Sequence, residues 1–165
     1  MAKTFFKKIV VAVNGRLSSI HASMYAIMMS RTYNLSLKFV YVVDTATIKY
    51  LTMNKLLVTD EKEDFETKLF EDGKHYLEYV QQMAATKGVK AEIELRSGGV
   101  FTEIIKCADE YDADLILLGG KEKNPKTTSL KKNVLSRDEN EVLVNASCPV
   151  LIVQKPDIEA VFKIF

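Results

Sequence analysis

Residues 8–13 of the chain read KIVVAV, and Asn14 and Gly15 follow directly. A run of mostly β-branched apolar residues that ends at an Asn-Gly pair predicts a strand buried on both faces, followed by a sharp turn. Strands of this kind belong to parallel sheets that are covered by helices on both sides. The start of the sequence therefore indicates an α/β protein.

Strand and helix patterns alternate along the rest of the chain. Further strands are predicted at 35–43, 89–95, 114–118 and 149–153. Amphipathic helix patterns lie between them, and Ser18 or Ser19 is expected to cap the first helix. Residues 45–60 have no clear period and predict a surface excursion with a short helical piece, whereas 60–85 carry a long helical stripe.

Five strands joined by helices predict a five-stranded, mostly parallel sheet with helices on both faces, because crossover connections are right-handed. In such sheets ligands bind at the carboxyl ends of the strands, near the point where the strand order reverses. The loops after the first, second and fourth strands should converge there. The sequence therefore predicts a ligand site formed by Asn14 and Gly15, by 42–44, and by the loop that begins at Gly119.

Composition limits the class of function. The chain has 165 residues, enough for one domain, and its net charge of +1 gives no general attraction to nucleic acid or to an anionic membrane. The first apolar run is too short for a signal peptide, so we expect a cytoplasmic protein. Two cysteines and two histidines with scattered carboxylates predict neither a disulfide framework nor a metal site.

Four segments resemble the universal stress protein family in their order and spacing. They are KKIVVAVNG at 7–15, FVYVVD at 39–44, ADLILLGG at 113–120 and SCPVLIVQ at 147–154. The resemblance implies a flavodoxin- or Rossmann-like three-layer sandwich with strand order 3-2-1-4-5, and a homodimer formed through the last strand. We expect one domain over 1–155, followed by a C-terminal tail at 156–165 that is too apolar to be a solvated end and packs on the domain or on the dimer partner.

The resemblance also points to a motif after the fourth strand, Gly-x-x-Gly-(nine residues)-Gly-Ser/Thr, that the ATP-binding members of this family share. There, glycines bring backbone N–H groups close to the phosphates. Gly119 matches the first glycine, but Glu122 stands at the second. Ser136 and Arg137 stand where the last Gly-Ser/Thr pair is expected, and the loop has four extra residues. The ATP-binding motif is therefore degenerate.

Two further positions correspond to the family's adenine contacts. Asn14 replaces the usual aspartate after the first strand and has a different donor capacity, while Val42 matches a position that acts through its backbone. Asn14 and Gly15 are also explained by turn chemistry alone. The Lys-rich loop 121–132 is open to two interpretations, a replacement anion site built from lysines and hydroxyls or a solvated surface loop.

The candidate ligand-binding residues are Val13, Asn14, Gly15, Val42, Asp44, Gly98, Gly119, Gly120, Lys121, Lys126, Thr127, Ser136 and Arg137. No nucleophile with a base, paired carboxylates or metal cluster is recognisable, so we expect no enzymatic activity. The resemblance implies a stress-response regulator that binds an adenine nucleotide of the ATP or AMP type, or another phosphate-bearing ligand. The alternative is a dimeric interaction protein that binds no nucleotide and engages a partner protein.

Overall fold

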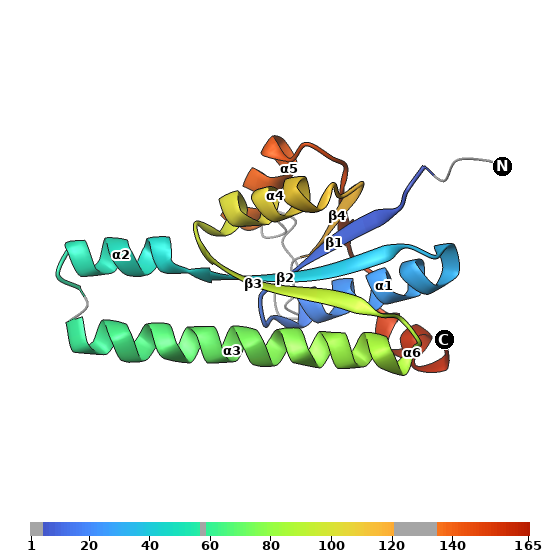
Figure 1. Ribbon diagram of the computed structural model, residues 1–165, viewed down its shortest axis with the longest axis horizontal. Coiled ribbons are helices and arrows are strands. Elements are labelled where there is room, and N and C mark those ends of the chain that lie inside the picture. Colours follow the sequence, from blue (N-terminus) through green and yellow to red (C-terminus); the bar gives the residue numbers. More distant parts are fainter. Residues whose placement is uncertain (1–4, 57–58, 121–134) are drawn as a thin grey trace, which may run out of the picture.

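A computed structural model of the chain describes residues 5–56, 59–120 and 135–165. Its elements are, in chain order, β1 (Lys8–Val13), α1 (Leu17–Tyr33), β2 (Ser36–Asp44), α2 (Thr45–Met53), α3 (Thr59–Thr86), β3 (Ala91–Gly98), α4 (Val100–Tyr111), β4 (Leu115–Gly119), α5 (Arg137–Asn145), β5 (Val150–Val153) and α6 (Ile158–Ile164). The five strands form one sheet in the order β3-β2-β1-β4-β5, and every pair of neighbours is parallel (Figure 1). The predicted fold and strand order are confirmed.

The central strand β1 explains why the opening run of the sequence is apolar at nearly every position. Ile9 pairs with Leu37 of β2 on one side and with Leu115 of β4 on the other. Ile9, Val10 and Val11 have no exposed surface, because helices cover the sheet on both faces. The strand is therefore buried on both faces, as predicted.

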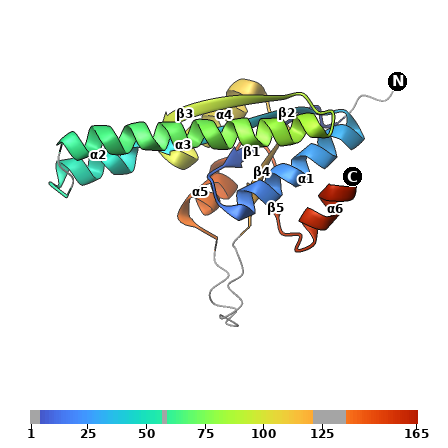
Figure 2. The ribbon, with the colours of Figure 1, turned by 90° about the horizontal axis from the view of Figure 1, so that it is seen from below.

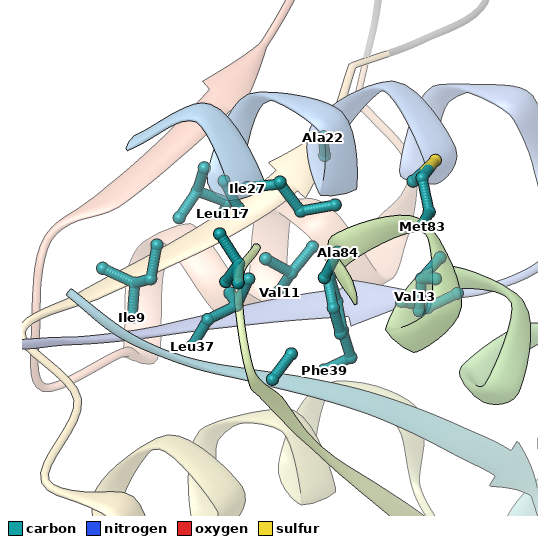
Figure 3. Packing of buried hydrophobic residues seen from close by; sticks show 14 of the residues in the cluster. Ile9, Val11, Val13, Ala22, Ile27, Leu37, Phe39, Met83, Ala84 and Leu117 are labelled. Carbon is teal, nitrogen blue, oxygen red and sulfur yellow. The ribbon is translucent and has the colours of Figure 1, made fainter. Parts of the chain in front are cut away.

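Helices α1 and α3 cover one face of the sheet. Ile9, Val11 and Val13 alternate toward this side, where they pack with Ile27 of α1 and Ala84 of α3 in the largest hydrophobic cluster (Figure 3). Seen from below, α1 and α3 lie side by side, and α6 lies beyond α1 (Figure 2). Apolar burial at this interface is the main source of stability of the fold.

Helices α4 and α5 cover the opposite face. Ile104 of α4 and Val142 of α5 pack against Ile116 and Leu118 of β4, and all four side chains are buried. This layer completes the three-layer arrangement and places the N-termini of α4 and α5 at the carboxyl edge of the sheet (Figure 1).

The C-terminal segment forms the short helix α6, which contacts α1. Ile158 and Phe162 are buried in this contact. At its end, the Arg31 guanidinium donates a hydrogen bond to the carbonyl of Phe165 over 2.9 Å. Ile158 and Phe162 are thus covered by the same chain, whereas Ile164 is 87% exposed.

Strand β2 leads into α2 without an intervening loop. We call α2 together with residues 59–72 of α3 the arm, because these helices run antiparallel beyond the carboxyl ends of the strands (Figures 1 and 2). Residues 45–53 form a regular helix, so the excursion predicted at 45–60 is more ordered than its sequence pattern indicated. No helix in the described part of the chain combines the length and the hydropathy that a membrane span needs.

Candidate ligand site

A pocket of about 310 Å³ lies at the carboxyl edge of the sheet. Six of the sequence-predicted residues line it, namely Val13, Asn14, Val42, Asp44, Gly119 and Ser136. They come from the ends of β1, β2 and β4 and from the start of α5, which the parallel topology brings together. Gly15, Gly98, Gly120 and Arg137 are not among the lining residues, and Lys121, Lys126 and Thr127 lie outside the described residues.

The turn between β1 and α1 is closed by side-chain hydrogen bonds. The Asn14 carboxamide oxygen accepts a bond from the Arg16 N–H over 3.0 Å, and Gly15 adopts a left-handed φ of 79°. The Ser19 hydroxyl accepts from the Asn14 N–H over 3.2 Å and donates to the Arg16 carbonyl over 2.9 Å. The carboxamide oxygen of Asn14 is therefore engaged in the turn, even though the residue lines the pocket.

These contacts correct the expected cap of the first helix. The N-cap of α1 is Arg16, and no side chain caps it. Ser19 lies inside the helix with 1% of its surface exposed, and its hydroxyl bridges the turn instead. A serine near a helix start can serve the preceding loop as well as a cap, because its oxygen both donates and accepts.

Gly119 and Gly120 are required by close packing. A Cβ atom on Gly119 would lie 2.4 Å from the Ser18 carbonyl carbon, so only glycine lets α1 approach β4 this closely. A Cβ on Gly120 would lie 2.5 Å from Cγ of Gln154, and its N–H donates to the Val153 carbonyl over 3.1 Å. Packing thus accounts for both glycines, and Gly119 in addition forms part of the pocket wall.

Asp44 connects the pocket to the arm. It is the last residue of β2 and the N-cap of α2, where its carboxylate accepts bonds from the Thr47 N–H over 3.0 Å and from the Thr47 hydroxyl over 2.6 Å. Gly98 pairs with Asp44 in the neighbouring strand and has a φ of 136°. Gly98 therefore serves the turn that leads into α4.

The start of α5 is closed by a capping box. The Ser136 hydroxyl accepts a bond from the Glu139 N–H over 3.3 Å, and the Glu139 carboxylate accepts one from the Ser136 N–H over 2.9 Å. Because each residue satisfies a backbone donor near the helix start, those donors are occupied within the chain. Ser136 is thus a helix cap as well as a lining residue.

Asp138 lies in the first turn of α5, close to Phe101 at the start of α4. Burial and the nearby Asp44 carboxylate raise the pKa of its side chain, while Arg137 and a hydrogen bond with the backbone of Phe101 act in the opposite direction. Glu139 also raises it. The charge of Asp44 therefore reaches Asp138 and disfavours its ionised form.

Several lining residues were not expected from the sequence. Arg16, Tyr41 and Leu69 line the pocket together with Asp138 and Glu139. Tyr41 stacks on Tyr76 of α3 with ring centres 6.2 Å apart, so its place depends on how α3 packs. Asp138 and Glu139 could have been predicted, because Ser136 followed three residues later by Glu139 is a capping-box pattern and marks the start of a helix. No sequence pattern predicts that Leu69 lines the pocket, since its position depends on how the arm packs.

The described residues offer little reactive chemistry near this site. No group of three or more His, Cys, Asp or Glu side chains in residues 5–56, 59–120 and 135–165 is arranged to hold a metal ion. Burial raises the pKa of the Cys107 thiol to about 12, which keeps it protonated at neutral pH, and His21 pairs with Glu159 over 3.0 Å on the surface. The arrangement is suited to binding a ligand.

The fold defines a Rossmann-like α/β protein, with a pocket at the carboxyl edge of its parallel sheet. The sequence matches the Universal stress protein family over residues 5–154. It is 32% identical to Universal stress protein MJ0531 of Methanocaldococcus jannaschii over 95% of this chain and 87% of that protein. The chain therefore belongs to the universal stress protein family.

Two solved structures of the family share the fold. A universal stress protein in complex with cAMP matches 90% of this chain and 97% of its own with a TM-score of 0.60 and 20% identity. A universal stress protein from Archaeoglobus fulgidus in complex with dAMP matches 92% of this chain and 100% of its own with a TM-score of 0.61 and 17% identity. At these identities the likeness concerns the fold.

Proposed function

We propose that this chain is a cytoplasmic stress-response regulator that binds an adenine nucleotide in the pocket and catalyses no reaction. The main support is that Val13, Val42 and Gly119, from three separate strands, line one pocket of about 310 Å³. That volume lies at the small end of the range for small-molecule sites. Apolar side chains form much of the wall, as a flat base requires, and Asn14 and Arg16 are among its polar lining residues.

Relatives with bound nucleotides add to this support. The two solved structures described above hold cAMP and dAMP, both of which combine an adenine base with a single phosphate group. A site of the same kind in this chain would place the base against the apolar wall and the phosphate toward the polar side. Release or capture of the ligand would then report the nucleotide state of the cell.

Isothermal titration calorimetry with adenosine, AMP, cAMP, ADP and ATP tests this function. The Val100→Trp variant fills the pocket from the start of α4 and is expected to abolish binding. Val144→Trp is its matched control, because Val144 on α5 is 80% exposed and does not line the pocket. Absence of binding by all five compounds, or equal binding by both variants, contradicts the proposal.

A second candidate function is a dimeric interaction protein that needs no nucleotide. Strand β5 is the last strand of the sheet beside β4, and its sequence from Val150 to Val153 is entirely apolar. Open edges of apolar strands favour pairing with another chain. Light scattering after size exclusion should give a dimer mass that Ile152→Lys reduces to a monomer and that Val144→Lys leaves unchanged. A monomeric wild-type chain excludes this assembly.

A further inference from the structure

Two helix N-termini at the carboxyl edge are capped by side chains of the protein itself. The Asp44 carboxylate caps α2 through the Thr47 N–H. The capping box of Ser136 and Glu139 closes α5. Backbone N–H groups at helix starts are the usual phosphate donors in this kind of sheet. Here the donors in these contacts are already used.

The side chains at these helix starts include acidic groups. Asp44, Asp138 and Glu139 line the pocket, and Arg16 is the cation among the described lining residues. Asp44 is near enough to Asp138 for its charge to raise the pKa of Asp138, in addition to the effect of burial. A nucleotide gains negative charge with each added phosphate, so its repulsion by these carboxylates increases along the series from adenosine to ATP.

The described glycines at this edge have little free space on the side where a side chain would begin. The Cβ position of Gly119 lies 2.4 Å from the carbonyl carbon of Ser18. The Cβ position of Gly120 lies 2.5 Å from Cγ of Gln154. A ligand therefore cannot approach either glycine from that side.

We infer that Asp138, supported by Asp44, determines specificity in this pocket: the site accepts adenosine or its monophosphate and discriminates against ATP. This inference rests on the proposed nucleotide-binding function and names the ligand class within it. Arg16 is a cation in the described lining, and Arg137 acts on Asp138 from the same helix, whereas Asp44, Asp138 and Glu139 put three carboxylates in the lining. The discrimination arises from charge repulsion between these carboxylates and each added phosphate.

Calorimetric titration of adenosine, AMP and ATP against the wild type and Asp138→Asn tests this inference, both in EDTA and with Mg²⁺. Asparagine keeps the size of aspartate and one side-chain acceptor oxygen, so the variant should fold normally. We expect the wild type to bind AMP more tightly than ATP. The variant should bind ATP about tenfold more tightly than the wild type does, with adenosine unchanged. Asp44→Asn, which retains the cap of α2, should shift the ratio in the same direction.

Asp109→Asn is the matched control, because it makes the same charge change on the exposed surface of α4 and does not line the pocket. It should leave all three affinities unchanged. Wild-type protein that binds ATP as tightly as AMP in either medium overturns the inference while leaving the proposed function intact. An unchanged ATP-to-AMP ratio in both pocket variants also overturns it. If none of the three ligands binds the wild type, the proposed function fails and the inference fails with it.

Discussion

Asp114 and Asp138 lie at opposite edges of the same sheet, and the protein treats their charges differently. At the amino edge, the Asp114 carboxylate accepts hydrogen bonds from the N–H groups of Lys8 and Lys7 over 2.9 and 2.8 Å, and these bonds lower its pKa. At the carboxyl edge, burial and Asp44 raise the pKa of Asp138. The ionised carboxylate of Asp114 thus stabilises the fold at the amino edge, whereas the ionised carboxylate of Asp138 is disfavoured at the carboxyl edge, beside the pocket.

The largest difference between the edges should appear at two glycines. Gly119→Ala places a Cβ atom against the backbone of Ser18 at the carboxyl edge, and we expect a loss of about 3 kcal/mol in the free energy of unfolding. Gly88→Ala at the amino edge has open space around its Cβ and suffers only from its φ of 74°, at about 1 kcal/mol. Urea denaturation measures both. Equal losses would mean that the tight contact at Gly119 relaxes at little cost.

A smaller effect is expected from removing the amino-edge charge. Asp114→Asn keeps one acceptor oxygen but loses the ionic strengthening of two hydrogen bonds, so unfolding at pH 7 should become easier by about 1 kcal/mol, after allowance for solvent screening. Because the folded pKa lies below the ordinary value of 3.8, the stabilisation is present above that value and is lost as the pH falls through the folded pKa. Denaturation curves of both proteins from pH 7 to pH 2 should therefore converge. A constant gap across this range contradicts the assigned role.

The smallest effect, with the opposite sign, is expected at the carboxyl edge. The folded pKa of Asp138 is raised, so its contribution to stability is most favourable below 3.8 and is lost as the pH rises through the folded pKa. Relative to Asp138→Asn, the wild type should lose stability over that interval because the charged form is buried and lies near Asp44 and Glu139, with only partial compensation from Arg137. The same denaturation series measures it. A wild type that gains stability over the variant with rising pH would break the contrast between the two edges.

Much of the fold could be predicted because its signals are local. The apolar run at 8–13 requires burial on both faces, and the alternation of strands and helices then leaves few topologies. The same topology explains why Val13, Val42 and Gly119 could be expected near one another, since parallel strands end at one edge. The backbone topology alone places these three residues at the pocket.

The remaining parts of the site depend on contacts between distant segments. Leu69 reaches the pocket because α3 extends beyond the sheet, and the sequence of a helix does not state where it crosses a strand end. The Ser19 hydroxyl was free to cap a helix or to bridge a turn, and the Asn14 N–H decides between them in the folded chain. The role of Asp138 likewise depends on where α4 begins in space.

Because β2 passes directly into α2, the arm joins the sheet at Asp44, which is also part of the pocket wall. The nine residues of α2 extend roughly 13 Å from that point. A rotation about Asp44 therefore displaces the end of α2, where Met53 is 74% exposed, further than it displaces residues beside the pocket. A ligand that pulls the Asp44 carboxylate away from Thr47 would change the position of this exposed end of the arm.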